Sequence, residues 1–371
     1  MTVVLDALEL WTQHGDRVAL TTVVETKKSA PQPAGTKMAV NEHGAIAGAV
    51  SGGCVEGAVV EVAERVLAGG APQLLHYGIA DADAWDVGLP CGGEISIWVE
   101  AYGAATLQAR FDGCARRGER SAIVTVVGQS PHLGAKLLVG AGGEREGSLG
   151  DEALDASAVE LAEEALWAER SELREHEGAT LFIDVTAPPS RLIVVGAVDF
   201  AAQLSAVAVL AGWRAFVVDP RARFATAERF PAAEQVIAAW PDDAFAQLEP
   251  IDRATAIAVL THDPKLDDAA LIAALASPAG YIGAMGSRRA QSRRRERLLA
   301  AGIDPAELER VAAPIGLDIG ALTAAETALS IMSEIVALRH GRLGGRLRHA
   351  EGRIHDVPEP DGVASVGGIS T

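Results

Sequence analysis

The sequence has few cysteines and no long apolar run, and each lack excludes a class of protein. Cys54, Cys91 and Cys114 are the only cysteines, and no two form a C-x-x-C pair. This argues against a disulfide framework and a structural zinc site, and no metal ligands are assigned. No apolar run reaches the roughly 18 residues of a membrane-spanning helix. Residues 1–14 lack the pattern of a signal peptide and predict an amphipathic helix. A cytoplasmic location is therefore expected.

Positive charge is also scarce. The formal charge of −18 over 371 residues repels the phosphates of nucleic acids and of anionic membranes, so neither is expected as a general partner. The arginines between Arg288 and Arg297 are a local exception. With 49% hydrophobic and 22% charged residues, the composition is that of folded domains rather than of a disordered chain.

The chain divides at Pro188-Pro189-Ser190. Short strands and helices mix irregularly before this point, and apolar strands alternate with helices after it, which is typical of a covered parallel sheet. We expect an α/β protein with a mixed α/β N-terminal domain at residues 1–187 and a Rossmann-like parallel-sheet domain at 190–342. Residues 343–371 lack apolar periodicity and are expected to form a tail.

The first domain contains an internal repeat. Residues 35–67 align without gaps onto residues 134–166, at an offset of 99. The matched residues include Gly35, Lys37, Gly48 and Glu64, which meet Gly134, Lys136, Gly147 and Glu163. Each copy reads as strands, a glycine turn and a helix, which predicts a duplicated unit with pseudo-two-fold character. A chance match of segments rich in alanine and glycine is the alternative.

The two copies differ where the helix begins. The first copy has Ser51-Gly52-Gly53-Cys54, and the second has Gly150-Asp151-Glu152-Ala153. The fold therefore does not need the Gly-Gly-Cys sequence there, which favours a chemical role. A thiol at a helix start would meet unpaired N–H groups and the positive end of the helix dipole, and both lower a thiol pKa.

A second cysteine, Cys91, lies in a glycine-rich loop with Gly92 and Gly93, whose small residues allow a ligand to come close. For Cys54 and Cys91 the alternative is a small buried apolar residue. Cys114 lacks such surroundings and is interpreted as structural.

Three segments of the second domain are candidates for ligand contacts. Gly286-Ser287-Arg288-Arg289 runs from a strand into a helix, with Ser287 as N-cap. Two arginines in the first helical turn oppose the helix dipole, which suggests that an anion such as a phosphate binds there; a solvated basic helix end is the alternative. His262 follows an apolar strand and would bind a ligand, act as acid or base, or simply cap its loop. Asp318 lies in a glycine-hinged loop and would face the same cleft or stabilise a turn.

The dinucleotide-binding fingerprint is altered. Gly196-Ala197-Val198-Asp199 has a branched side chain and a negative charge where a Rossmann turn admits the pyrophosphate. Asp219 nevertheless stands where such a domain places its ribose-binding acid. We expect NAD(P) not to bind tightly.

Five motifs in order resemble the XdhC/CoxI family, accessory proteins of molybdenum hydroxylases. They are Ser51-Gly-Gly-Cys-Val-Glu56, Gly88-Leu-Pro-Cys-Gly-Gly93, Thr261-His-Asp-Pro-Lys265, Tyr281-Ile-Gly-Ala-Met-Gly-Ser-Arg-Arg289 and Pro314-Ile-Gly-Leu-Asp-Ile-Gly320. The resemblance covers roughly residues 5–341 and implies that the chain binds molybdenum cofactor. It further implies that the chain helps a cysteine desulfurase to sulfurate the cofactor and delivers it to the apo-hydroxylase, as a homodimer. Val198 and Asp199 depart from the Gly-x-Gly-His-type loop of the family, which puts contacts made by that loop in doubt.

These observations predict one site. Cys54, Cys91 and His262 would carry chemistry, and the following residues would bind the cofactor: Ser51, Gly52, Gly53, Gly92, Gly93, Gly286, Ser287, Arg288, Arg289 and Asp318. The cofactor is an anionic phosphate ester with a soft dithiolene-bound metal, which suits the arginines and the thiols. A maturation factor is favoured over a true enzyme. The alternatives are an NAD(P)-dependent oxidoreductase and a docking protein without catalytic function.

Overall fold

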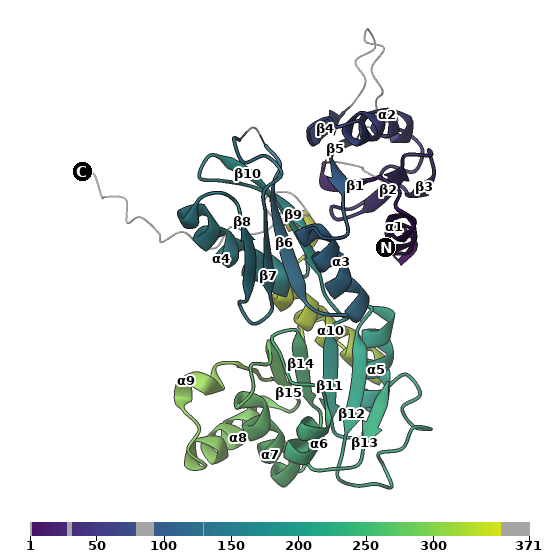
Figure 1. The fold of residues 1–371 in the computed structure, drawn as a ribbon. Coiled ribbons are helices and arrows are strands. Elements are labelled where there is room, and N and C mark those ends of the chain that lie inside the picture. Colours follow the sequence, from purple (N-terminus) through teal and green to yellow (C-terminus); the bar gives the residue numbers. More distant parts are fainter. Residues whose placement is uncertain (1, 28–31, 79–92, 129, 350–371) are drawn as a thin grey trace, which may run out of the picture. The chain divides into compact units, whose positions relative to one another are not determined.

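The computed structural model describes residues 2–27, 32–78, 93–128 and 130–349. The chain forms two compact units, Met1–Pro188 and Pro189–Thr371, each of which is described here by itself (Figure 1). The amphipathic helix expected at the N-terminus is α1 (Thr2–His14), which buries Val4, Leu5 and Leu8. Most of the expected C-terminal tail lies outside the described residues.

The first unit consists of two halves with the same order of elements. After α1, the first half contains β1 (Val18–Lys27), β2 (Lys37–Asn41), β3 (Ile46–Gly48), α2 (Glu56–Leu67), β4 (Gln73–Tyr77) and β5 (Glu94–Tyr102). The second half contains α3 (Leu107–Arg117), β6 (Ser121–Val126), β7 (Lys136–Gly140), β8 (Arg145–Ser148), α4 (Glu152–Ala168), β9 (Glu172–His176) and β10 (Ala179–Thr186). We call these halves the first and the second repeat.

The two repeats share one topology. Their antiparallel sheets have the orders β3-β2-β1-β5-β4 and β8-β7-β6-β10-β9, so each strand has its counterpart at the same place. Gly48 and Gly147 have φ angles of 84° and 92°, which residues other than glycine rarely adopt. A Cβ atom would lie 2.5 Å from the Lys37 carbonyl oxygen at Gly48, and 2.4 Å from that of Lys136 at Gly147. The predicted duplication is therefore confirmed in topology and in local geometry.

Two ion pairs join the repeats reciprocally. Lys37 of the first repeat pairs with Asp184 of the second, and Lys136 of the second pairs with Glu100 of the first at 2.9 Å. Lys37 and Lys136 are equivalent by the offset of 99. Glu100 and Asp184 are also equivalent: Glu100 in β5 faces β1, and Asp184 in β10 faces β6, at corresponding positions of these strands. The contact is thus made from both sides, as in a dimer with two-fold symmetry.

Both pairs are withdrawn from solvent. The side chains of Lys37 and Asp184 are only 2% and 7% exposed. Burial disfavours the Lys37 ammonium, but the nearby carboxylates, Asp184 foremost, hold its pKa above the ordinary value. The Ser171 hydroxyl also donates to Asp184 at 2.8 Å. Between the sheets, an apolar cluster of Val24, Trp98, Val127 and Phe182 draws two residues from each repeat.

The second unit is a parallel sheet covered by helices on both faces (Figure 1). The strands have the order β13-β12-β11-β14-β15-β16, which is the Rossmann order. The strands are β11 (Arg191–Val195), β12 (Arg214–Val218), β13 (Gln235–Ile237), β14 (Thr255–Val259), β15 (Tyr281–Ala284) and β16 (Val311–Ala312). The helices are α5 (Asp199–Leu210), α6 (Pro241–Gln247), α7 (Pro264–Leu275), α8 (Arg288–Ala300), α9 (Pro305–Leu308) and α10 (Ala324–Arg339). The expected fold class is therefore confirmed.

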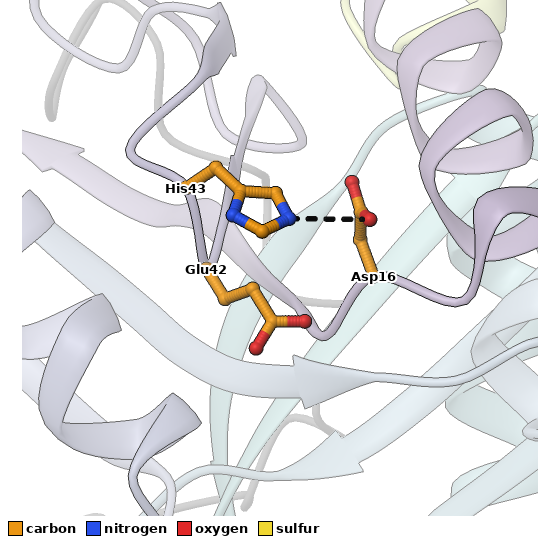
Figure 2. Close-up of side chains that lie close together, drawn as sticks. All are labelled: Asp16, Glu42 and His43. Atoms are coloured by element: carbon orange, nitrogen blue, oxygen red, sulfur yellow. Dashed lines mark ion pairs between the residues drawn. The ribbon is translucent and has the colours of Figure 1, made fainter.

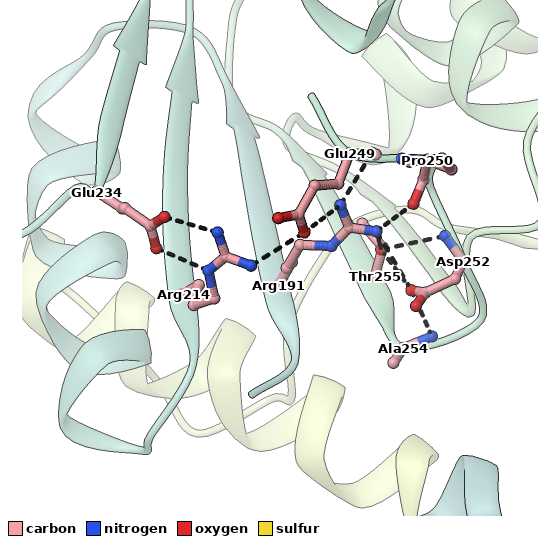
Figure 3. A network of polar contacts seen from close by, with 8 residues as sticks. All are labelled: Arg191, Arg214, Glu234, Glu249, Pro250, Asp252, Ala254 and Thr255. Carbon is pink, nitrogen blue, oxygen red and sulfur yellow. Dashed lines mark hydrogen bonds and ion pairs between the residues drawn. The ribbon is translucent and has the colours of Figure 1, made fainter. Parts of the chain in front are cut away.

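A polar network fastens the amino ends of the central strands (Figure 3). Arg191 opens β11, and its guanidinium donates to the carbonyl oxygen of Glu249 at 2.9 Å and to the hydroxyl of Thr255 at 3.0 Å. Arg214 opens β12 and binds the Glu234 carboxylate through two N–H groups, at 2.7 and 2.8 Å. This network lies at the amino ends of the strands, whereas parallel α/β sheets bind ligands at the carboxyl ends. We therefore assign it a structural role.

Candidate functional site

The loop before α2 is organised around one carboxylate. Glu56, the first residue of α2, accepts hydrogen bonds at 2.8 Å from the backbone N–H groups of Ser51, Gly52 and Gly53. The Ser51 hydroxyl donates to the same carboxylate at 2.6 Å. Burial raises the pKa of Glu56, but these hydrogen bonds outweigh it and lower the pKa to about 2. Glu56 was not among the predicted site residues, and it holds the whole loop.

The two glycines of the loop are required by their backbone angles. Gly52 and Gly53 have φ angles of 83° and 114°. A Cβ atom at either position would meet no atom within 4 Å, so the space beside the loop is open. The half-buried Cys54 packs at the edge of the apolar cluster under α2. Its thiol is thus carried by a loop with room for a ligand.

One part of the expectation for Cys54 is wrong. Unpaired N–H groups were expected around its thiol, but the amide of Cys54 donates to the Ser51 hydroxyl at 3.1 Å, and the neighbouring amides donate to Glu56. The carboxylate therefore occupies the positive end of this helix. The separation of five positions between Ser51 and Glu56 was the available signal, because a glutamate there can reach back over the loop.

In the second repeat, carboxylates also bind the backbone amides at the helix start, but without a glycine pair in the loop. Asp155, the counterpart of Glu56, accepts from the Leu149 amide at 2.6 Å. Asp151 caps α4 by accepting from the amides of Ala153 and Leu154 at 3.0 Å. Both repeats thus place an acid at this helix start. Only the first exposes a glycine pair followed by a cysteine, which supports a special role for that loop.

Replacing Glu56 by glutamine is expected to loosen the loop. Loss of a charged acceptor for several amides should cost the loop about 1–2 kcal/mol, and hydrogen exchange at Gly52 and Gly53 should accelerate about tenfold. In the unmodified protein the same protection should be present above pH 4.5 and lost as the pH falls towards 2, since folding lowers this pKa. Glu64→Gln, at an exposed position of α2, is the matched control. Unchanged exchange in Glu56→Gln would contradict the assigned role.

Cys91 and Gly92 lie outside the described residues, so their part in the site stays a prediction. Gly93 is buried just before β5. Arg17, before β1, donates to the Leu67 carbonyl at the end of α2, so the start of α2 faces the other end of this sheet. There β4 ends at Tyr77 and β5 begins at Glu94. Cys54, Tyr77 and Ile95 pack in one cluster, so these ends of β4 and β5 lie on the Cys54 side of the sheet.

In the second unit the predicted residues gather at one edge. His262 follows β14, Gly286 and Ser287 follow β15, and Asp318 follows β16. These strands are parallel, so their carboxyl ends lie at the same sheet edge, where ligands of such folds bind. His262, Ser287 and Asp318 are exposed there.

The arginines of α8 divide into two groups. Arg294 is buried and pairs with Asp267 at 2.5 Å, Arg297 pairs with Asp268 at 2.6 Å, and Arg295 with Glu309 at 3.0 Å. These three are structural. Arg288 and Arg289, and Arg293 one turn further along the helix, are exposed and have no partner among the described residues. Ser287 caps the helix through the Ala290 amide at 3.3 Å, as predicted. Two free guanidinium groups therefore stand at a capped helix start, as an anion site requires.

The first turn of the Rossmann-like unit is closed by its own residues. Asp219 is fully buried and accepts from the Ala197 amide at 2.8 Å and from the Arg221 guanidinium at 2.7 Å. Burial opposes ionisation of Asp219, but Arg221 and the Ala197 amide keep its pKa below the ordinary value. An Asp219 engaged in this way is not free to bind a ribose. This geometry adds to the argument against NAD(P) made from Val198.

Three polar side chains near the start of β1 were not predicted (Figure 2). His43 faces Asp16 at 3.5 Å, and a ligand atom from each of Asp16, Glu42 and His43 lies within 4.8 Å of the others. Glu42 already pairs with Arg17 at 2.8 Å, and Asp16 accepts from Asn41 at 3.0 Å. Because protein partners use both carboxylates, we interpret the cluster as a brace for this turn.

Sequence comparisons identify the family. A model described as the XdhC and CoxI family matches residues 11–78 and 114–177, and one described as the XdhC Rossmann domain matches residues 192–335. The chain belongs to the XdhC/CoxI family. The two ranges of the first match lie in the first and the second half of the first unit.

Relatives in the XdhC/CoxI family have related names. A Bacillus subtilis protein, named as a probable xanthine dehydrogenase subunit, is 27% identical over 90% of this chain and 96% of its own length. The Escherichia coli protein "Molybdenum cofactor insertion chaperone PaoD" is 26% identical over 88% of this chain and 84% of its own length. A crystal structure described as a xanthine dehydrogenase from Bacillus halodurans superposes with a TM-score of 0.56 at 23% identity, covering 94% of this chain and 98% of the other. That likeness supports the fold.

The helices in the described part of this XdhC/CoxI chain were compared with the length and hydropathy of a membrane span. Among the described residues, none is long and apolar enough to cross a bilayer.

Proposed function

We propose that this chain binds molybdenum cofactor and assists its sulfuration and its insertion into a molybdenum hydroxylase of the xanthine or carbon-monoxide dehydrogenase type. The observation that carries the proposal is the pair of free guanidinium groups, Arg288 and Arg289, at the capped start of α8. This arrangement suits the phosphate ester of the cofactor. The name of the Escherichia coli relative supports the same cargo.

The thiol of Cys54 supplies the second half of the proposal. A sulfur atom on an open, glycine-flanked loop fits the soft metal end of the cofactor or a relay of sulfur. Under the proposal, Cys54 and Cys91 lie towards this end of the cofactor, with Ser51, Gly52, Gly53, Gly92 and Gly93 around it. In the second unit, the proposed phosphate contacts are Gly286, Ser287, Arg288 and Arg289, and His262 and Asp318 are further candidates at the same end of the sheet.

The proposed partners are an apo-hydroxylase, which receives the cofactor, and a cysteine desulfurase, which supplies sulfur. The chain would act in the cytoplasm as a homodimer. In this role it is a maturation factor, and the substrate oxidation belongs to the hydroxylase.

The test is cofactor retention. The protein is purified after co-expression with cofactor biosynthesis, and molybdenum and released oxidised pterin are quantified. Arg288→Ala and Arg289→Ala should each lower retention about tenfold or more, because charge-assisted hydrogen bonds contribute about 1.5–3 kcal/mol each. Arg293→Ala changes an exposed arginine of the same helix that has no partner among the described residues; it is the matched control and should retain cofactor fully.

The thiols are tested by a second readout. Cys54→Ala and Cys91→Ala should reduce the sulfurated fraction of the delivered cofactor, measured as hydroxylase activity after transfer, whereas Cys114→Ala should not. Unchanged retention and transfer in the arginine and cysteine variants would overturn the site. Micromolar binding of NAD(H) or NADP(H) in calorimetry would instead favour the oxidoreductase alternative. Capture of the hydroxylase without any affinity for cofactor would favour the docking alternative.

A further inference from the structure

A cavity that is about half open to solvent lies at the boundary between the two repeats, and the proposed function does not use it. It has a volume of about 690 Å³, which falls in the range of small-molecule sites. Residues of both repeats line it. Its apolar part adjoins the cluster of Val24, Trp98, Val127 and Phe182 between the two sheets. The cavity is therefore built by the reciprocal contact of the repeats.

Equivalent positions of the two repeats form its walls. Leu74 and His76 come from β4, and Leu173 and Glu175 come from β9, at the offset of 99. Alternate residues of a strand point to the same face, so each edge strand presents one leucine and one polar group to the cavity. The leucines match, whereas histidine faces the cavity from one side and glutamate from the other.

The imidazole of His76 is oriented by a relay of hydrogen bonds. Nδ1 of His76 lies 3.0 Å from the Ser96 hydroxyl, which in turn donates to the Glu25 carboxylate at 3.4 Å. When the single hydroxyl proton goes to Glu25, the serine oxygen accepts from Nδ1–H, which is one of the two tautomers that this contact allows. In the neutral ring, Nε2 is then a bare acceptor, and it has no partner among the described residues.

The opposite wall provides a second acceptor. One oxygen of the Glu175 carboxylate accepts from the Thr180 hydroxyl at 3.1 Å, and the other has no partner among the described residues. Lys27, whose side chain is 41% exposed, pairs with Glu25 at 3.0 Å and retains N–H groups for another acceptor. Two acceptors and one donor thus surround an apolar floor of leucines and Val127.

We propose that this inter-repeat cavity binds a planar heterocycle that carries neighbouring N–H donors and a carbonyl along one edge. The leucines would cover the ring faces, Glu175 and Nε2 of His76 would accept the N–H groups, and Lys27 would donate to the carbonyl. The 2-amino-4-oxopyrimidine edge of guanines and pterins has this pattern. The two glutamates disfavour a purely anionic ligand such as inorganic phosphate. The proposal requires neither the Cys54 loop nor the arginines of α8.

The experiment uses the full chain and pterin, a fluorescent probe that lacks metal and phosphate. Quenching of pterin fluorescence should be saturable with a micromolar Kd. Glu175→Gln and His76→Phe should each weaken binding about tenfold, and Leu173→Trp, which fills the cavity, should abolish it. Glu164→Gln, at an exposed position of α4, is the control with unchanged affinity. Circular dichroism verifies that each variant is folded.

Competition experiments identify which class of heterocycle the cavity recognises. Guanosine should displace pterin if the pyrimidine edge alone is recognised, and a failure of guanosine would restrict the site to pterins. Xanthine, which lacks the 2-amino group, should compete at least tenfold more weakly. Absence of saturable quenching up to 1 mM, or equal affinity in all variants, would overturn the proposal.

The two proposals fail separately. Arg288→Ala should not change binding of pterin, which has no phosphate. Loss of pterin binding in Leu173→Trp with full cofactor retention would leave the proposed function standing and separate this cavity from it.

Discussion

Replacing Lys37 by methionine is expected to lower the free energy of unfolding of the first unit by about 3–5 kcal/mol. The substitution removes the cation of a buried ion pair. The Asp184 carboxylate, whose side chain is only 7% exposed, is then left without its partner. The same contact joins the two repeats, so the loss should appear in both. Urea unfolding read by hydrogen exchange in peptides of β5 and β10 measures it.

A double-mutant cycle isolates the pair. Asp184→Asn alone should also be destabilising, whereas adding Asp184→Asn to Lys37→Met should cost much less than a second full penalty, because no charge is then left unpaired. Lys136→Met, at the equivalent and slightly more exposed position, should have a smaller effect of the same kind. Arg145→Met, in an exposed pair with Glu152, is the control and should change stability by at most about 0.5 kcal/mol. Additive effects of the two single substitutions would contradict a coupled pair.

Replacing Asp112 by asparagine is expected to stabilise the protein at neutral pH. Asp112 lies in α3, is 4% exposed, and has one carboxylate oxygen to which no described residue donates a hydrogen bond. Lys37 and Lys136 are already balanced by Asp184 and Glu100, so an ionised Asp112 is a surplus negative charge. Burial raises the pKa of Asp112 to about 6, with Lys37 opposing and Asp184 reinforcing the increase.

The sign of the pH dependence follows from this pKa. Because folding raises the pKa from 3.8 to about 6, Asp112 favours the folded state most below pH 3.8. That contribution, at most about 3 kcal/mol, declines as the pH rises through 6. Asparagine imitates the neutral acid at every pH. Asp112→Asn should therefore gain up to about 3 kcal/mol at pH 7.5 and remove this slope.

Urea unfolding at several pH values between 4 and 7.5 measures both effects. Asp6→Asn, at an exposed carboxylate of α1, is the control and should shift stability by less than about 0.5 kcal/mol. An unchanged profile for Asp112→Asn would mean that Asp112 is already ionised in the folded protein at pH 4.

The repeats and the parallel sheet could be predicted because they depend on regular patterns. The offset of 99 preserved Gly48 and Gly147, whose backbone angles tolerate little else. The reciprocal contact could not be predicted, since Lys37 and Asp184 are 147 residues apart and nothing local marks them as partners. The equivalence of Lys37 and Lys136 was visible, but a lysine shared by both repeats is equally compatible with a solvated surface.

The candidate site was predicted in its residue types better than in its hydrogen bonds. Ser287 as N-cap and the exposed Arg288 and Arg289 follow from helix-end chemistry, which is local. Glu56 and Arg221 were missed because each binds a feature that precedes it in the sequence. Glu56 accepts from the Ser51–Gly53 loop, and Arg221 donates to Asp219, whereas both features had been interpreted as contacts for a ligand. A charged residue a few positions beyond a glycine-rich turn should therefore be considered as the internal occupant of that turn.

The fusion of the two repeats in one chain also determines how a ligand between them can be oriented. Two identical subunits related by an exact axis would offer an asymmetric molecule two equivalent poses, rotated by half a turn. Here histidine stands opposite glutamate while the leucines remain paired, so the walls are alike in shape and different in polarity. A guest in the inter-repeat cavity would consequently have one preferred pose, and the end of it that points to solvent would be the same in every molecule.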